Sequence, residues 1–298
     1  MDGICKLCGK QKELCESHII PSFVIQWLKK SSATGFIRFG EILNRRVQDG
    51  LKKHLLCEEC EQLFSGFEKS FSEEIFQPSC NGNIPKETYG PWLLKFATSV
   101  SWRVLTSLEN KILSIYPEHH KKAAAHALEV WKDFLLDKRP HPEKHEQHML
   151  FLGAIKEHTF DELPTNINRY FLRVIDMDAI YTDDTAHVYT KMGHVVIVGF
   201  INVPRPKEWV GTILHVKHGN IVSPKYTLPL NFGEYLKDRA RNCEGFYNKI
   251  SQKQAIKIDT DYRKAPLRAM NSETWKAMQY DFDMFGEKAF IPSDKAKK

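Results

Sequence analysis

Two short cysteine pairs decide the fold of the N-terminal part of this chain: residues 5–8 read CKLC and residues 57–60 read CEEC. Zinc in structural sites takes four ligands in a tetrahedron, and two C-x2-C pairs supply four thiolates that can reach one ion. Gly9 follows the first pair and suits the tight turn of a zinc knuckle. The pattern therefore predicts one structural Zn2+ held by Cys5, Cys8, Cys57 and Cys60.

The second cysteine pair opens a predicted helix. Leu63, Phe67 and Phe71 recur at helical spacing on the side opposite Glu61 and Glu68. A redox-active C-x2-C pair is the alternative reading, but such a pair would follow a strand in an alternating strand–helix unit, which this stretch does not show. We therefore expect a treble clef, in which the second pair lies at the start of a helix.

The composition is that of an ordinary folded protein, with 42% hydrophobic and 27% charged residues among 298. No window approaches the roughly 18 apolar residues of a membrane-spanning helix, and the N-terminal MDGICKLCGK has no apolar signal core. The seven cysteines are an odd number, which argues against a secreted disulfide framework. We expect a cytoplasmic protein without a membrane partner. The net charge of +6 permits nucleic-acid contact without requiring it.

The hydrophobic pattern divides the chain into three predicted segments. A zinc-binding module takes residues 1–83, a helical region with a linker takes 84–148, and an α+β domain with an antiparallel sheet takes 149–298. In the middle segment we expect helices from about 90 to 117 and from about 118 to 138, each ended by proline. The polar, proline-punctuated stretch at 139–148 is the predicted linker.

The last segment changes to a period of two. The stretches RYFLRVIDM (169–177), AHVYTKMGHVVIVGFINV (186–203) and TILHVKHGNIVS (212–223) read as strands, with hairpin turns at Gly193 and Gly219. Strands without intervening helices favour an antiparallel sheet, and helices are expected at 232–250 and 272–285. The predicted fold class is α+β: a treble-clef module, a helical middle region and a C-terminal antiparallel sheet with flanking helices. A short strand is also expected at Phe36–Phe39.

Three stretches together resemble a known family: CKLCGK at 5–10, ESHIIPSF at 16–23 and GLKKHLLCEECEQLFSGFE at 50–68. They are similar to the zinc-bearing form of the HNH, or ββα-metal, endonuclease motif. The resemblance covers about residues 1–75, and within it the chain looks most like a group of bacterial HNH-like proteins that carry the pattern without an established activity. Proteins with such a head and a further domain resemble components of bacterial defence or of mobile elements.

The resemblance implies an active site. His18 occupies the place of the general base that deprotonates water, and Glu16 and Glu61 are the oxygen ligands nearest the motif for a catalytic Mg2+ or Mn2+. The sequence departs from the motif at three places. Ser17 stands where the family usually has Asp or His, and Lys52 falls near its middle asparagine. The final His or Asn of the motif is either replaced by Glu61 or lost.

A second hypothesis follows from these departures. The module would then be a non-catalytic zinc finger that binds nucleic acid or a protein partner. The two readings differ in geometry, because an enzyme needs His18 and two carboxylates to converge on one point inside a basic groove. The expected nucleic acid is DNA, held by three basic pairs whose alternative role is that of a solvated surface: Lys29 and Lys30, Arg45 and Arg46, and Lys52 and Lys53.

Other groups offer weaker signals. His141, His145 and His148 have near-helical spacing and suit a metal in principle, but they lie in the predicted linker. Arg103 is expected to reach the surface or pair with a carboxylate rather than bind phosphate. The C-terminal domain shows no phosphate loop, nucleophile elbow or dinucleotide fingerprint. Its expected role is therefore to recognise a partner, such as a protein, or to act as a scaffold.

Overall fold

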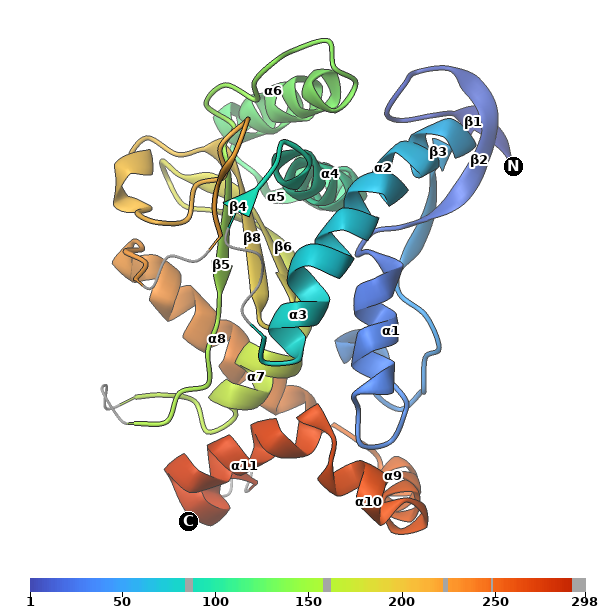
Figure 1. The fold of residues 1–298 in the computed structure, drawn as a ribbon, viewed down its shortest axis with the longest axis vertical. Coiled ribbons are helices and arrows are strands. Elements are labelled where there is room, and N and C mark those ends of the chain that lie inside the picture. The colour runs from blue at the N-terminus through green and yellow to red at the C-terminus, as the bar shows by residue number, and fades with distance from the viewer. Residues whose placement is uncertain (84–87, 158–161, 222–224, 248, 291–298) are drawn as a thin grey trace. The chain divides into compact units, whose positions relative to one another are not determined.

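The computed structural model describes residues 1–83, 88–157, 162–221, 225–247 and 249–290 (Figure 1). The chain forms two compact units, each assembled from three separate segments. The first unit comprises Met1–Ser22, Gly50–Phe151 and Ile175–Leu228, and the second comprises Phe23–Asp49, Leu152–Val174 and Pro229–Lys298. The first unit runs across the boundaries at 83/84 and 148/149 that the sequence pattern predicts. The predicted segments 1–83 and 149–298 each contribute to both units, whereas the predicted segment 84–148 lies wholly in the first unit.

The first unit begins with a small antiparallel sheet. Its strands are β1 (Asp2–Ile4), β2 (Gln11–His18) and β3 (Lys52–Cys57), in the order β1-β2-β3. A shift in the β2–β3 register lies between Cys15 and Glu16. Helix α2 (Glu58–Phe71) starts directly after Cys57, as the sequence predicted.

Helix α2 runs on into a π-helical turn at Ser72–Phe76 and a short helix α3 (Gln77–Cys80). It packs on α4 (Trp92–Ser107), where the rings of Phe71 and Phe96 stack with centroids 4.0 Å apart. Twelve of the 16 residues of α4 are buried, as expected of a helix at the centre of a core. The chain then forms α5 (Glu109–Ile115) and α6 (Glu118–Leu135). The predicted helix at 90–117 is therefore two helices, and the prediction at 118–138 is confirmed.

A four-stranded antiparallel sheet completes the first unit (Figure 1). Its order is β5 (Gln147–Phe151), β8 (Val195–Asn202), β7 (Ala186–Met192) and β6 (Ile175–Tyr181). Helices α4 and α6 pack against it. Gly193 forms the predicted turn between β7 and β8 with a φ of 62°. The model is thus mixed α+β with an antiparallel sheet in this unit, as the sequence predicted.

Several local predictions differ from the structure. The stretch at 169–177 forms the end of helix α7 (Ile167–Arg173) before β6, and 139–148 ends in strand β5 instead of a pure linker. The stretch at 212–223 contributes only β9 (Gly219–Asn220), which pairs with β4 (Thr88–Tyr89), while 222–223 lies outside the described residues. At 36–39 the chain makes only an isolated bridge between Ile37 and Val47.

The second unit is helical. Besides α7 it contains α1 (Ser22–Lys30), α8 (Leu230–Tyr247), α9 (Gln252–Lys264), α10 (Pro266–Met270) and α11 (Glu273–Phe285). The helices predicted at 232–250 and 272–285 correspond to α8 and α11. Ile167, Tyr170 and Ala240 pack together in a small core, and all three residues are fully buried.

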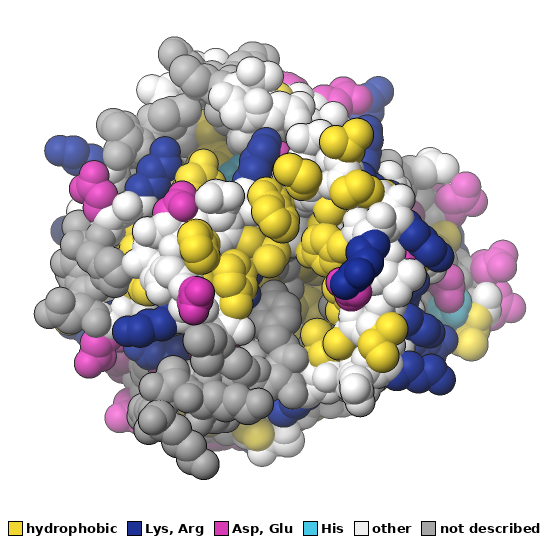
Figure 2. Space-filling model, turned by 90° about the horizontal axis from the view of Figure 1, so that it is seen from below, with side chains coloured by type: hydrophobic (Ala, Val, Ile, Leu, Met, Phe, Trp, Pro, Cys, Tyr) yellow, Lys and Arg dark blue, Asp and Glu magenta, His cyan; other side chains and the backbone are white. Residues whose placement is uncertain are grey.

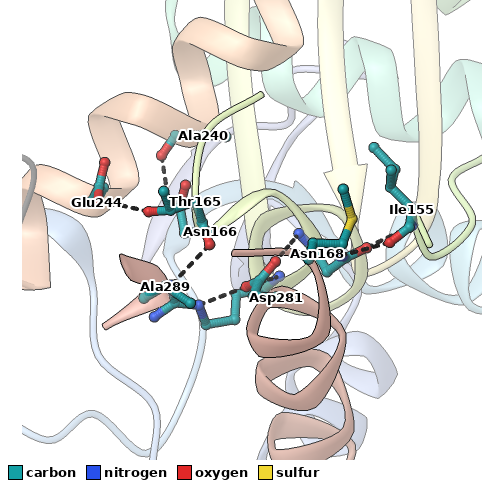
Figure 3. A network of polar contacts seen from close by, with 10 residues as sticks. Ile155, Thr165, Asn166, Asn168, Ala240, Glu244, Asp281 and Ala289 are labelled. Atoms are coloured by element: carbon teal, nitrogen blue, oxygen red, sulfur yellow. Dashed lines mark hydrogen bonds and ion pairs between the residues drawn. The ribbon is translucent and has the colours of Figure 1, made fainter. Parts of the chain in front are cut away.

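A polar network ties α7 to α11 in this unit (Figure 3). The buried carboxylate of Asp281 accepts hydrogen bonds from the backbone N–H groups of Asn168 (2.8 Å) and Arg169 (3.1 Å), and pairs with Nε of Arg169 at 2.8 Å. Because these N–H groups belong to the first turn of α7, the carboxylate acts as a cap supplied by another helix.

Apolar side chains also remain at the surface, and Figure 2 shows hydrophobic side chains gathered on one face of the molecule. On α10 and α11 the exposed ones are Leu267, Met270, Trp275 and Phe282. Within the described residues, no helix has both the length and the apolar character required to span a membrane.

Candidate metal centre and the end of strand β2

The four predicted cysteines come together at the junction of the knuckle, β3 and α2. The sulfur atoms of Cys5, Cys8, Cys57 and Cys60 all lie within 4.8 Å of one another. Three of the four residues are buried, and Cys8 is half-buried. Four thiolates within this span could hold a metal ion such as zinc. All seven cysteines are free of disulfide bonds.

Backbone hydrogen bonds shape the knuckle and join it to the hairpin. The N–H of Gly9 donates to the carbonyl of Cys5 at 2.9 Å, and the N–H of Cys5 donates to the carbonyl of Lys10 at 3.0 Å. The N–H of Lys6 donates to the carbonyl of Leu55 in β3 at 2.9 Å. The two halves of the cysteine cluster are therefore held together by the backbone as well.

The cluster lies at the N-terminus of α2, because Cys57 is the N-cap residue and Cys60 lies in the first turn. This end of a helix favours negative charge. Burial works to raise the pKa of Cys5, but backbone hydrogen bonds from Cys8, Cys57 and Leu7 outweigh it and lower the pKa to about 7. Burial raises the pKa of Cys57 and that of Cys60. A bound divalent cation would stabilise the deprotonated form of these thiols and so offset the effect of burial on Cys57 and Cys60.

Cys15 does not belong to the cluster. Burial raises the pKa of its thiol, and the negative charges of Glu61 and Glu58 add to the effect. A thiol with a raised pKa is a poor nucleophile.

His18 is the last residue of β2 and lies opposite Lys52 of β3 in the antiparallel register. Its carbonyl accepts a hydrogen bond of 3.0 Å from Nη1 of Arg103. Ser17, which precedes it, is fully buried, and its Oγ accepts a hydrogen bond of 3.2 Å from the N–H of Leu56. Ser17 therefore stabilises the hairpin, and its hydroxyl is turned into the core.

Arg103 of α4 connects three elements from a buried position, with 2% of its side chain exposed. Nη2 pairs with the carboxylate of Glu68 in α2 at 2.7 Å, Nη1 contacts the end of β2, and Nε donates to the carbonyl of Ser99 at 3.3 Å. The expected pairing of Arg103 with a carboxylate is thus confirmed. The sequence pattern placed Glu68 on the polar side of the helix. In the structure its carboxylate is instead largely buried in the ion pair with Arg103.

The two carboxylates predicted as cation ligands lie on different elements. Glu16 is on β2, is mostly exposed, and pairs with Nζ of Lys52 at 3.7 Å. Glu61 is on α2, and its Oε1 is buried without a hydrogen-bond partner in the described part of the chain. Among the described residues, the four cysteines are the only group of three or more His, Cys, Asp or Glu side chains close enough to share a metal ion. Glu16, His18 and Glu61 do not form such a group.

The six predicted nucleic-acid-binding residues fall in different units. In the first unit, Lys52 pairs with Glu16, and Nζ of Lys53 donates to the carbonyl of Ser107 at 2.7 Å. In the second unit, Arg46 pairs with Asp261 and lies over the ring of Phe36. Arg45 and Lys30 are exposed, and Nζ of Lys29 donates to the carbonyl of Gln48 at 2.8 Å.

The three histidines at 141–148 do not form a metal site in the structure. His145 and His148 are buried, while Nδ1 of His141 accepts a hydrogen bond from the N–H of Glu143. His145 contacts His126 at 2.8 Å and the carbonyl of Phe200 at 3.1 Å, and His148 contacts Oγ1 of Thr212 at 2.8 Å. His145 and His148 are therefore buried polar residues that have hydrogen-bond partners in the core, whereas His141 is exposed.

Comparison with family models, curated proteins and solved structures finds no match to this chain.

Proposed function

We propose that the four cysteines bind one structural zinc ion and that the surrounding ββα module is an HNH-like endonuclease, which hydrolyses phosphodiester bonds of nucleic acid, with DNA as the expected substrate. The observation that carries the proposal is the arrangement of the cysteine cluster, the hairpin and His18. The four cysteines join the knuckle to the start of α2. Strands β2 and β3 pair antiparallel, and His18 is the last residue of β2.

The residues present fit zinc well. The donor set consists of four sulfur atoms, which zinc accepts as tetrahedral ligands in structural sites. The bound ion would neutralise the thiolates and fix the entry of α2 against β3. The zinc would therefore contribute to folding rather than to chemistry.

In the proposed reaction His18 removes a proton from the attacking water. Its position at the strand end is held through its own backbone, because Arg103 binds its carbonyl and is in turn held by Glu68. Arg103 is thus a positioning residue for the proposed base.

The resemblance also implies a catalytic Mg2+ or Mn2+, and here the described residues do not fit. Glu16 pairs with Lys52, and Glu16, His18 and Glu61 do not form a group able to share one ion. No step is therefore assigned to a second cation, and the assay below measures the dependence on it directly.

A second candidate function is a non-catalytic zinc module that binds nucleic acid or a protein partner. The specific observation in its favour is the same lack of convergence, together with the buried Ser17 at a ligand position of the motif. In this case the zinc centre stabilises a binding surface, and His18 has only a local structural role.

The experiment compares wild-type protein with His18→Ala on plasmid and single-stranded DNA, with Mg2+, with Mn2+, or without added divalent cation. Zinc content is measured in both proteins to show that the module is intact. We expect cleavage by the wild type and its loss in the variant. Absence of cleavage by zinc-loaded wild type under all conditions would contradict the endonuclease and favour the binding module. The matched control is His54→Ala, which removes an exposed histidine of the neighbouring strand.

A further inference from the structure

A cleft of about 390 Å³ lies within the second unit, beside the C-terminal end of α1 and helix α10. Its lining residues are Gln26, Lys29, Lys30, Gly35 and Arg268. Three of these side chains carry positive charge and none carries negative charge. The cleft therefore concentrates like charges from two elements that are distant in sequence.

Among the described residues, the cations of this cleft have no carboxylate partner. The ion pairs of the second unit within the described part of the chain involve other residues, and none of them includes Lys29, Lys30 or Arg268. Lys29 donates to the carbonyl of Gln48 at 2.8 Å, and Arg268 donates to the carbonyl of Lys29 at 3.4 Å. Both acceptors are neutral carbonyl oxygens, so these two hydrogen bonds do not compensate the positive charge.

The backbone around Gly35 fits closely against one of these cations. Gly35 has a φ of 74°, and a Cβ at this position would lie 2.8 Å from Nη2 and 3.1 Å from Cζ of Arg268. Oγ of Ser32 accepts the N–H of Gly35 at 2.7 Å and donates to the carbonyl of Lys29 at 3.0 Å. The loop is thus fastened to the end of α1, and the absence of a side chain at Gly35 leaves room for the guanidinium.

We propose that this cleft binds phosphate groups of a nucleic-acid backbone. The inference rests on the proposed function, since it names the surface that holds the substrate. Lys and Arg are the side chains that neutralise backbone phosphates, and an unpaired guanidinium offers a fork of donors to phosphate oxygens. The lining contains no aromatic ring on which a base could stack, which favours the backbone over the bases.

The test measures binding without cleavage. It uses His18→Ala protein without added divalent cation, labelled single-stranded and duplex oligonucleotides, and fluorescence anisotropy at several salt concentrations. Replacing Lys30 and Arg268 together by Glu is expected to raise Kd at low salt by about tenfold or more, and to reduce the slope of log K against log salt by about 2. The control pair Lys253→Glu and Lys257→Glu makes the same change in net charge at exposed positions of α9. Its expected effect on Kd is much smaller.

Three results would overturn the proposal. They are an equal loss of affinity in the cleft and control variants, an unchanged affinity in the cleft variant, and no binding of any oligonucleotide. Displacement of the oligonucleotide by an equal concentration of ATP would overturn the assignment to a nucleic-acid backbone. The cleavage assay separates the two proposals, because cleavage by a protein with the cleft charges reversed would leave the endonuclease standing without this site.

Discussion

Arg103 shows how one buried cation connects the proposed site to the rest of the first unit. It joins Glu68 of α2 to the carbonyl of His18 at the end of β2, and only 2% of its side chain is exposed. Removing one partner of such a pair leaves the other charge buried and uncompensated, which is more harmful than losing an exposed ion pair. The effect of Arg103 should therefore appear in stability as well as in activity.

We predict that Arg103→Met lowers the free energy of unfolding by about 3–5 kcal/mol, because Glu68 then has no partner. The measurement is urea unfolding of the zinc-loaded protein. Lys132→Met is the control, since its ion pair with Glu129 joins two side chains of one helix at the surface and should contribute about 0–1 kcal/mol. Equal effects of the two substitutions would contradict the structural role of Arg103.

Residues differ in how far their role could be predicted from the sequence. The cysteine cluster follows from ligand type and spacing alone, because two C-x2-C pairs leave few other uses for four thiols. The roles of Ser17 and Glu16 could not be predicted in this way. Both depend on the β2–β3 register and on its shift at Cys15 and Glu16, which determine whether a side chain faces the core or the solvent.

At the scale of the elements, the four-stranded sheet of the first unit has histidines in its core. Burial lowers the pKa of His145, His187 and His194 to about 4 in each case. In the unfolded chain a histidine takes up its proton near pH 6.5. Between these values the unfolded state binds more protons than the folded state, so stability is full above about pH 6.5 and is lost as the pH falls towards 4.

We predict that His187→Phe reduces this loss of stability between pH 7 and 4.5. The largest contribution of one such histidine is about 3 kcal/mol. Urea unfolding at several pH values measures it. Release of the proposed zinc ion at low pH would affect wild type and variant alike, so the difference between their two pH profiles isolates the histidine. Profiles that run parallel would show that His187 does not carry this pH dependence.

Helix α7 depends on a carboxylate from another helix. Asp281 of α11 is fully buried. Its carboxylate accepts hydrogen bonds from two backbone N–H groups in the first turn of α7 and pairs with Arg169 (Figure 3). We predict that Asp281→Ala destabilises the second unit by about 3–5 kcal/mol, because it leaves Arg169 and two backbone donors without their acceptor. Amide hydrogen exchange checks this, with faster exchange expected in α7 and α11. Asp283→Ala, at a neighbouring exposed position, is the control, and equal exchange in both variants would contradict the capping role.

Elements with strong periodicity, such as α2, α6 and the β7–β8 hairpin, were predictable, whereas short or polar ones were not. The stretch at 169–177 contains a short apolar run that suits either a helix end or a strand, and it forms both. The stretch at 139–148 looks like a linker because it is polar, yet His145 and His148 are buried with hydrogen-bond partners. A sequence pattern shows which residues are polar, but it does not show whether a residue distant in the sequence supplies a hydrogen-bond partner for them.

Taken as a whole, the molecule is assembled from discontinuous segments, and this is the feature that the sequence was least able to predict. The predicted segments follow changes in composition along the chain. The two units instead each collect three separate stretches, so residues close in sequence, such as Lys30 and Lys52, belong to different units. Contacts between distant stretches leave no trace in composition, so basic residues that are near one another in the sequence do not by that alone belong to one site.

Metal binding should affect the stability of the whole molecule. The cysteine cluster fastens the N-terminal knuckle to the start of α2, so removing the ion should loosen β1–β3 and the first turns of α2. We predict that a strong chelator lowers the Tm of the wild type and that added zinc restores it. Thermal unfolding followed by circular dichroism measures the change. A Tm that is unaffected while the zinc is shown to be removed would contradict a structural role for the metal.

The proposed zinc centre is tested most directly by the metal content of the purified protein, determined by mass spectrometry. The account predicts about one zinc ion per wild-type chain, its loss in Cys8→Ser or Cys60→Ser, and its retention in Cys15→Ser, because Cys15 lies outside the cluster. A wild-type chain without metal, or zinc that remains after two of the four cysteines are replaced, would contradict it.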